Sequence, residues 1–286
     1  MPFPVPLSMP LALELHVALD AARNAAETVM AYYDAHSAET YTKGDGSPVT
    51  DADIAADRVI CDAILAAFPG DALLTEESED DETRLTNPRV WIIDPIDGTA
   101  QFVARTGQFD VLIALAIEGE VKVAATIQPT TGLVHAAILG AGAWRNDGHG
   151  WERLALGPDQ EPPRLVASRY YVLPGQQSWI PALAEAFATE LPQVMDVGFQ
   201  PRAMDPAERW YDAFLGFPQD PAIFAAREWD IAASDLIIHE SGGALTDFHG
   251  RRHRYNKPDT HIEDGLLVSA SPALHERLLR EIARLR

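Results

Sequence analysis

Two aspartates, Asp94 and Asp97, follow a short apolar run at residues 90–93, with Pro95 between them. The apolar run predicts a buried strand, and Pro95 is expected to end the strand's hydrogen-bond ladder because proline has no N–H to donate. Two carboxylates this close repel each other unless a cation lies between them, and hard oxygen ligands favour Mg²⁺. The pair alone also fits a solvated acidic turn after a core strand, so the rest of the chain must decide.

The chain turns directly after the two aspartates, at Gly98 and Thr99. We expect a helix to begin here, and the free N–H groups at a helix N-terminus suit a phosphate group. The stretch therefore predicts carboxylates for a metal and N–H donors for a phosphate at the carboxyl end of one strand.

Three further acids are candidates for the same site: Asp53, Glu76 and Asp230. Glu76 ends a predicted strand at residues 72–75 and precedes Asp94 by 18 positions, so the two strands can be neighbours with both acids at one end. Asp53 and Asp230 each lie in the first turn of a predicted helix, where the helix dipole favours a negative charge. Each acid alone has such an ordinary structural explanation, but their joint occurrence favours a metal site.

Four motifs in the chain occur in the order and at the spacing of a known family. They are residues 47–53 (SPVTDAD), 75–78 (TEES), 91–99 (WIIDPIDGT) and 229–233 (WDIAA). With these motifs the chain resembles the inositol monophosphatase-like superfamily of Mg²⁺-dependent, Li⁺-sensitive phosphatases. The resemblance implies an α/β (α+β) fold, a layered αβαβα sandwich of the type shared with fructose-1,6-bisphosphatase, often dimeric, with its active site between two halves.

The resemblance also implies which residues bind metal. One ion would bind Glu76, Asp94 and the backbone carbonyl oxygen of Ile96. A second ion would bind Asp94, Asp97 and Asp230. On the same basis Mn²⁺ would substitute for Mg²⁺, and Li⁺ would inhibit.

The implied catalytic residues are Glu76, Thr99 and Asp53. Asp53 would hold a third, weaker metal through water, alongside Glu76, and Thr99 together with Glu76 would orient the attacking water. The expected reaction is direct in-line attack of a metal-activated water on a phosphate monoester, without a phosphoenzyme. The expected substrate contacts are Gly98, Thr99, Asp97, Arg202 and Asp230.

Four stretches look like the 3′(2′),5′-bisphosphate nucleotidases of sulfur assimilation, which belong to this superfamily. They are residues 43–50, 80–85, 105–115 and 255–258. One stretch departs from that pattern, because residues 198–204 lack the small residues of the G-S-x-G-x-K element that binds the second phosphate of the nucleotide. Arg202 would replace its lysine, since arginine binds phosphate well.

The inositol-specific members place a carboxylate seven residues before the Trp-Asp aspartate, where this chain has Ile223. A basic run at residues 251–257 would suit a second phosphate, although a solvated surface loop is the favoured explanation. A bisphosphate nucleotide such as 3′-phosphoadenosine 5′-phosphate therefore narrowly leads inositol 1-phosphate as the expected substrate. Other sugar phosphates, histidinol phosphate and the 2′-phosphate of NADP stay open, as does a non-catalytic metabolite-binding protein that keeps the fold.

Composition limits the possible partners and compartments. The 286 residues carry a formal net charge of −21, which argues against binding nucleic acid through its phosphates. Cys61 is the single cysteine, so no intramolecular disulfide can form, and a reducing compartment is favoured. Residues 1–13 are apolar but contain four prolines and no positively charged start, unlike a signal peptide. We expect a cytoplasmic enzyme that acts on a small phosphorylated metabolite and has no membrane or nucleic-acid partner.

The predicted elements fall into two halves, divided by the proline-rich stretch at residues 157–163. The first half, residues 1–158, carries most of the metal ligands, and the second, residues 159–286, carries Asp230 and substrate contacts. Predicted helices cover residues 11–35, 51–68, 179–191, 205–215, 228–241 and 272–285. Predicted strands cover residues 72–75, 90–93, 109–118, 121–128, 133–139, 142–146, 164–168, 194–198, 222–226, 244–247 and 265–270.

Overall fold

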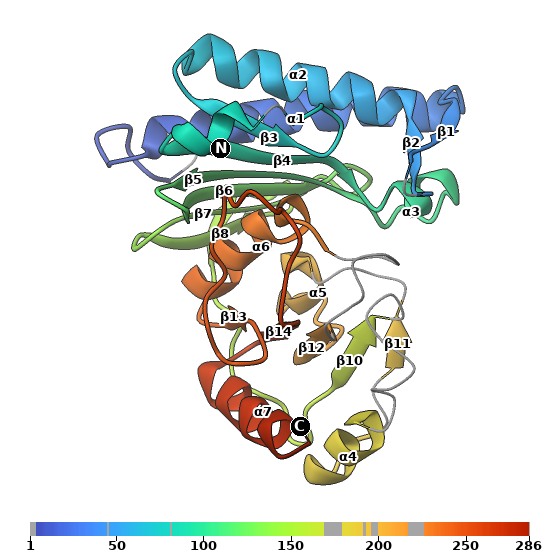
Figure 1. Cartoon of the computed structure of the whole chain (residues 1–286), viewed down its shortest axis with the longest axis vertical. Coiled ribbons are helices and arrows are strands. Elements are labelled where there is room, and N and C mark those ends of the chain that lie inside the picture. The colour runs from blue at the N-terminus through green and yellow to red at the C-terminus, as the bar shows by residue number, and fades with distance from the viewer. Residues whose placement is uncertain are drawn as a thin grey trace. The chain divides into compact units, whose positions relative to one another are not determined.

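The computed structural model describes residues 4–44, 46–80, 82–168, 179–190, 193–195, 200–216 and 226–285. The contacts within the chain divide it into two compact units (Figure 1). Unit 1 comprises Met1–Arg153, Glu228–Ile237 and Tyr255–Pro258, and unit 2 comprises Leu154–Arg227, Ile238–Arg254 and Asp259–Arg286. The units differ from the predicted halves in one important respect, because the segment that carries Asp230 packs within unit 1.

Unit 1 is built on a seven-stranded sheet with the strand order β3-β4-β5-β6-β7-β8-β9. The strands are β3 (Ala72–Thr75), β4 (Arg89–Asp97), β5 (Asp110–Ile117), β6 (Glu120–Gln128), β7 (Leu133–Ile138), β8 (Gly142–Asn146) and β9 (Trp151–Leu154). β3 runs parallel to β4, and β4 to β8 form an antiparallel meander. The sequence predicted these strands except β9, whose mostly exposed side chains leave no apolar pattern.

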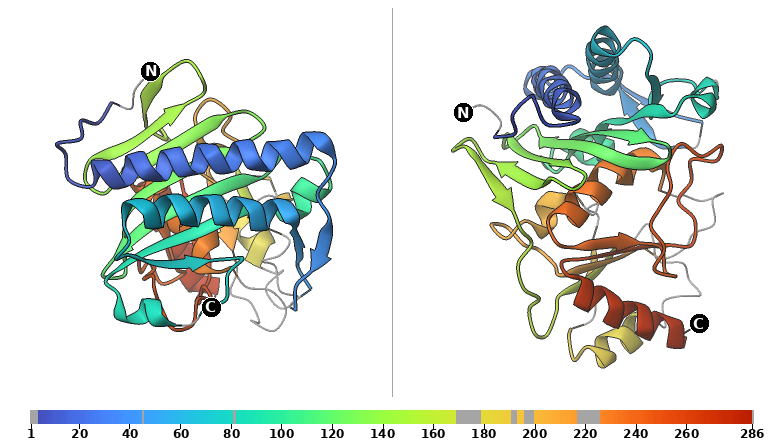
Figure 2. Two further views of the ribbon diagram at one scale, coloured as in Figure 1. Left: turned by 90° about the horizontal axis from the view of Figure 1, so that it is seen from above. Right: turned by 90° about the vertical axis from the view of Figure 1, so that its left-hand side faces the viewer.

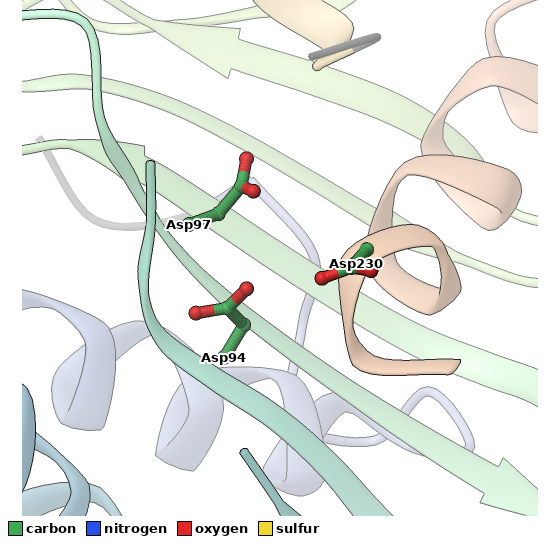
Figure 3. A group of neighbouring side chains, drawn as sticks. All are labelled: Asp94, Asp97 and Asp230. Atoms are coloured by element: carbon green, nitrogen blue, oxygen red, sulfur yellow. The ribbon is translucent and has the colours of Figure 1, made fainter. Parts of the chain in front are cut away.

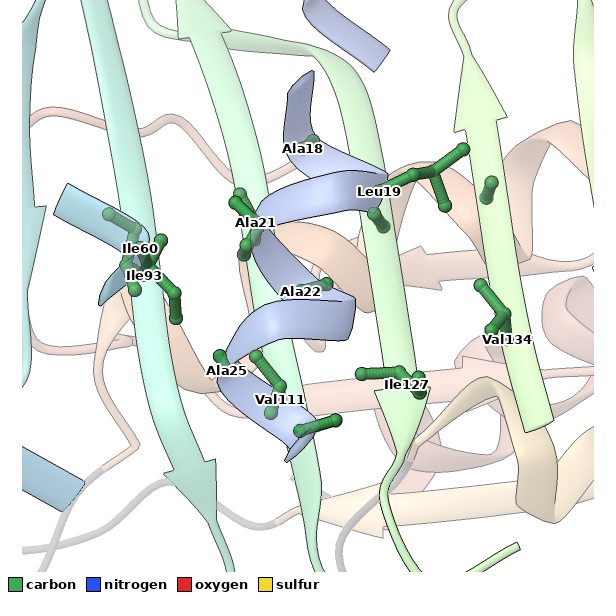
Figure 4. Packing of buried hydrophobic residues seen from close by; sticks show 14 of the residues in the cluster. Ala18, Leu19, Ala21, Ala22, Ala25, Ile60, Ile93, Val111, Ile127 and Val134 are labelled. Carbon is green, nitrogen blue, oxygen red and sulfur yellow. The ribbon is translucent and has the colours of Figure 1, made fainter. Parts of the chain in front are cut away.

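Two long helices, α1 (Ala12–Ala35) and α2 (Asp51–Ala67), lie side by side over one face of this sheet (Figure 2). The face of α1 that meets the sheet is rich in alanine, including the fully buried Ala18, Ala21 and Ala25. Figure 4 shows this face over buried β-branched residues of the strands, such as Val111 and Ile127. Small side chains let the helix approach the sheet closely, and the resulting core holds the strands that carry the acids in place.

The prediction that Pro95 ends the strand is wrong. β4 continues to Asp97, and its pairing with β5 shifts register between Asp94 and Asp97. Asp94 pairs with Leu112, and Asp97 pairs with Asp110, so three steps along β4 match two along β5. This is a β-bulge, where a proline is tolerated because its position needs no ladder N–H.

Shorter elements complete unit 1. They are β1 (Thr40–Thr42), β2 (Pro48–Thr50), the 3₁₀ turn η1 (Thr83–Thr86) and α3 (Thr99–Val103). α3 confirms the helix expected after Gly98, which has a positive φ of 96°. A Cβ at Gly98 would lie 3.0 Å from the carbonyl oxygen of Gln108, so both the backbone conformation and the space favour glycine.

Unit 2 contains a five-stranded mixed sheet with the order β11-β10-β12-β14-β13. Its strands are β10 (Leu165–Ser168), β11 (Gln193–Met195), β12 (Ala213–Gly216), β13 (Ala244–Thr246) and β14 (Leu266–Ser269). The helices are α4 (Trp179–Ala186), α5 (Pro201–Met204) and α7 (Pro272–Leu285), with α4 and α7 sharing an apolar core with the sheet. Helices on mixed sheets confirm the predicted α/β class. No helix of the described ranges is long and apolar enough to cross a membrane.

The helix predicted at residues 205–215 is wrong. Asp205 precedes a proline, and this disfavours helical backbone at Asp205. The apolar run Ala213–Gly216 is a buried strand between β10 and β14. A four-residue apolar run has no periodicity that separates a strand from a helix. Ile223, most of the predicted strand at 222–226, and Gly198 and Phe199 lie outside the described residues.

Candidate metal centre

Asp94, Asp97 and Asp230 bring their carboxylates together within unit 1 (Figure 3). One oxygen from each lies within 4.8 Å of the others. Asp94 and Asp97 come from β4, and Asp230 comes from the first turn of α6 (Glu228–Glu240). Asp94 is only 1% exposed and Asp97 and Asp230 are half-buried, so this cluster of like charges is not a solvated acidic turn.

The bulge in β4 explains how two acids three positions apart point to one side. In a regular strand, residues an odd number apart face opposite sides of the sheet. The extra residue between Asp94 and Asp97 reverses that alternation, so both carboxylates reach the same place. The N–H of Ile96 also donates to Asp94 Oδ1 at 3.1 Å, which holds the carboxylate in a tight local turn.

The electrostatics of the cluster favour a bound cation. Burial raises the pKa of Asp94 well above its ordinary value, and the neighbouring charges of Glu76, Asp97 and Asp230 raise it further. Carboxylates arranged in this way are stable together only when a proton or a cation neutralises them. The donor set consists of hard oxygen atoms, which fits Mg²⁺ or a similar divalent ion.

Glu76 stands beside Asp94, as the spacing predicted. β3 and β4 are parallel with Thr75 opposite Ile93, so the next residue on each strand is one of the two acids. Lys43 Nζ donates to Glu76 Oε1 at 2.7 Å and to Glu77 Oε1 at 2.8 Å. Lys43 lies in one of the nucleotidase-like stretches, but its role as the cation beside Glu76 was not predicted from the sequence.

Thr99 and Asp53 form a buried pair near Asp94. The Thr99 hydroxyl lies 2.8 Å from Asp53 Oδ1 and 3.1 Å from the carbonyl oxygen of Ile96. The other Asp53 oxygen accepts the N–H of Thr50 at 2.8 Å, which caps α2. Burial raises the pKa of Asp53, although hydrogen bonds from Thr50 and Thr99 oppose this. The predicted roles of Asp53 at a third metal, and of Thr99 with Glu76 at the water, stay predictions.

Asp57 is a buried acid that was not predicted as part of the site. Its Oδ2 accepts the hydroxyl of Ser78 at 2.9 Å, and the Ser78 N–H donates to Thr75 Oγ1 at 3.0 Å. These bonds fix the turn that carries Glu76. Asp57 lies four residues after Asp53 on α2, and two acids at this spacing on one helix face were the available signal.

Of the residues proposed for a second phosphate, Arg202 and the arginines of the basic run lie in unit 2, whereas Lys257 lies in unit 1. Arg202, on α5, is buried with its guanidinium 5.1 Å from the centre of the Trp210 ring. In the basic run, Arg251 donates to Asp247 and Asp264, both at 2.6 Å. These two carboxylates account for the charge of Arg251 without a ligand.

A cluster of carboxylates at the end of a bulged strand, on an α/β fold, provides a set of oxygen ligands suited to a divalent metal ion. Residues 12–286 match the model of the inositol monophosphatase family, and the chain belongs to that family. Members of the family are metal-dependent phosphatases, and this chain is one of them.

Individual relatives share most of their length with this chain. It is 30% identical to the 3′(2′),5′-bisphosphate nucleotidase CysQ of Shigella flexneri, over 87% of this chain and 96% of that protein. It is also 30% identical to the histidinol-phosphatase of Chlorobaculum parvum, over 91% of this chain and 93% of that protein. Among solved structures, CysQ from Bacteroides thetaiotaomicron superposes with a TM-score of 0.73 at 26% identity, covering 91% of this chain and 98% of that one.

Proposed function

We propose that this protein is a Mg²⁺-dependent phosphomonoesterase that acts on a small phosphorylated metabolite. The convergence of Asp94, Asp97 and Asp230 carries the proposal, because such a cluster needs a divalent ion to be stable when ionised. Together with Glu76 and the carbonyl oxygen of Ile96, these residues would hold two ions. Asp53 would support a third through water.

When bound, the ions supply charge neutralisation for the phosphoryl group and a lowered pKa for the attacking water. The chain's own residues position the reactants. Because the Thr99 hydroxyl donates its proton to Asp53, its oxygen would accept a hydrogen bond from the attacking water through a lone pair. The N–H groups of Gly98 and Thr99 would bind a phosphate oxygen, and the reaction would be in-line hydrolysis without a phosphoenzyme.

A 3′(2′),5′-bisphosphate nucleotide is the narrowly favoured substrate. The CysQ relatives support it, as do the stretches of this chain at residues 43–50, 80–85 and 255–258. The second candidate is a monophosphate such as inositol 1-phosphate or histidinol phosphate, since a histidinol-phosphatase is equally similar in sequence. Arg202 is the residue we assign to the second phosphate of a nucleotide.

The test is phosphate release with Mg²⁺ from five compounds: 3′-phosphoadenosine 5′-phosphate, inositol 1-phosphate, fructose 1,6-bisphosphate, histidinol phosphate and NADP. A preference in kcat/KM of about a hundredfold, or about 2.7 kcal/mol of transition-state discrimination, would identify the substrate class. No Mg²⁺-dependent release from any of them would contradict the proposed substrates. Replacing Mg²⁺ with Mn²⁺ should retain activity, and Li⁺ should inhibit. The cytoplasmic location is a prediction that fractionation of cells tests. The homodimer is a prediction that light scattering of the purified protein tests.

A further inference from the structure

Two of the stretches that resemble the nucleotidases meet each other in unit 1. Arg84, in η1, donates from Nη1 to Asn256 Oδ1 at 2.8 Å, and Asn256 Nδ2 donates back to the carbonyl oxygen of Arg84 at 3.1 Å. The two residues are 172 positions apart in the sequence. Motif similarity alone would assign both stretches to substrate binding, but here they bind one another.

All three nitrogens of the Arg84 guanidinium donate to protein groups. Its side chain is only 1% exposed, and its Nε and Nη2 both donate to Asp80, with the shortest bond 2.6 Å from Nη2 to Oδ2. With Nη1 on Asn256, every nitrogen of the guanidinium has a partner. A buried guanidinium held in this way serves as a fixed anchor.

Asn256 connects Arg84 to α6. It has a positive φ of 59°, a conformation that asparagine tolerates better than most residues. The backbone N–H groups of Asn256 and Lys257 both donate to the carboxylate of Glu228, at 2.6 and 3.0 Å. Glu228 is the first residue of α6 and is fully buried.

We propose that Arg84, Asn256 and Glu228, here called the clasp, position the first turn of α6 so that Asp230 meets the acids of β4. Asp94 and Asp97 are fixed by the seven-stranded sheet, whereas Asp230 reaches the cluster from a helix. The clasp contacts that helix at Glu228, which lies two residues before Asp230 in the same turn. It therefore sets the affinity of the site for metal and makes no contact with substrate, an inference that rests on the proposed metal site.

Asn256→Gly and Glu228→Gln test the clasp. Glycine keeps the positive φ and both N–H donors but removes the bonds to Arg84. Glutamine keeps the size of Glu228 and replaces one of its two acceptor oxygens with a donor group. The matched control is Tyr255→Phe, which removes a bond between the same two segments, from the Tyr255 hydroxyl to Asp235 at 2.8 Å, but further along α6.

The readout is calorimetric titration of the full-length protein with Mn²⁺ alone, followed by kinetics at varied Mg²⁺. Each clasp variant should bind Mn²⁺ about tenfold more weakly, as expected for loss of groups that orient a metal ligand. It should need more Mg²⁺ for half-maximal rate while keeping kcat at saturating Mg²⁺ within about threefold of the wild type. Tyr255→Phe should leave both metal constants unchanged.

Two results would overturn the inference. Unchanged Mn²⁺ affinity in both clasp variants, with only a lowered melting temperature, would make the clasp a general support of the fold. A raised KM for substrate at unchanged metal affinity would make it a substrate contact. Because Mn²⁺ binding is measured without substrate, the clasp is judged even if the phosphatase assay contradicts the proposed substrates.

Discussion

The first turn of α6 holds two acids in opposite situations. Glu228 is buried and accepts two backbone N–H groups, so the protein itself offsets part of the cost of burying its charge. Asp230, two residues later, faces Asp94 and Asp97. Burial raises the pKa of Glu228 to about 7 even with these donors, and burial together with like charges raises that of Asp94 well above its usual value.

The difference separates an acid that stabilises the fold from acids that bind a ligand. N–H donors are part of the chain, so Glu228 is compensated whether or not anything is bound. The cluster around Asp94 is compensated by protons or by a cation, and its stability therefore depends on the solution. Changes at the cluster should alter both metal binding and turnover, whereas changes at Glu228 should alter metal binding only through the position of α6 and should leave turnover at saturating metal near that of the wild type.

The largest expected effect comes from Asp94→Asn. Removing this charge should lower kcat by at least about a thousandfold, or about 4 kcal/mol, because under the proposed function Asp94 would be a ligand of both ions. The metal-free variant should melt at or above the wild-type temperature, since one repelling charge is gone from the cluster. Phosphate release and thermal unfolding in a chelator measure the two effects.

Asp20→Asn serves as the control for Asp94→Asn. Asp20 is an exposed aspartate that pairs with Arg23 on α1. Asp20→Asn should change neither kcat nor the melting temperature. Wild-type turnover in Asp94→Asn would remove Asp94 from the metal centre.

A buried histidine in unit 2 extends the comparison to a group that the fold keeps neutral. His275 lies between the hydroxyls of Thr246 and Ser269, both at 2.8 Å, and burial lowers its pKa to about 4. The unfolded chain, with a histidine pKa near 6.5, binds more protons between these values, so stability is fully present above about 6.5. The free energy of unfolding should fall by about 3 kcal/mol as the pH drops to about 4.

Denaturant unfolding across this pH range, in wild type and in His275→Gln, measures the effect. The variant should lose most of the slope between pH 6.5 and 4. The control variant Glu276→Gln, which changes the exposed residue next in the chain, should keep this slope. An identical slope in His275→Gln would assign the pH dependence to other groups.

The next effect in size is stabilisation by the metal. At a free Mg²⁺ concentration of about 100 times Kd, the free energy of unfolding should rise by about 2.7 kcal/mol over the value in chelator. The ion neutralises the cluster in the folded state and has no such site in the unfolded chain. Melting curves at increasing Mg²⁺ test this, and Asp94→Asn should show little of the rise. An equal rise in the variant would place the stabilising ion elsewhere.

Local signals predicted much of unit 1 and its acids. The α1 and α2 patterns and the turn at Gly98 are local in sequence, and the structure has each of them. The parallel pairing that sets Glu76 beside Asp94 followed from strand order and spacing. The bulge at Pro95 could not be predicted from one strand, because it is a property of the pairing between two strands.

Other parts of the site depend on contacts across the chain. Thr99 and Asp53 are 46 positions apart, and Arg84 and Asn256 are 172 apart, so no local pattern records either pair. In unit 2 the strand β12 is short and has no polar side chain, and the helix predicted at 205–215 failed for that reason. Propensity and periodicity do not show which buried strand a short apolar run joins.

The smallest effect concerns Arg202, which extends the comparison to a buried positive charge in unit 2. If it binds the second phosphate of a nucleotide, Arg202→Ala should raise KM for 3′-phosphoadenosine 5′-phosphate about tenfold, or about 1.4 kcal/mol, and that for a monophosphate much less. Arg202→Lys keeps the charge without the planar fork and should recover part of the loss. The ratio of the two KM values cancels any general loss of stability from removing a side chain packed on Trp210. Equal changes in both KM values would make Arg202 a packing residue and would leave the nucleotide assignment without a contact for its second phosphate.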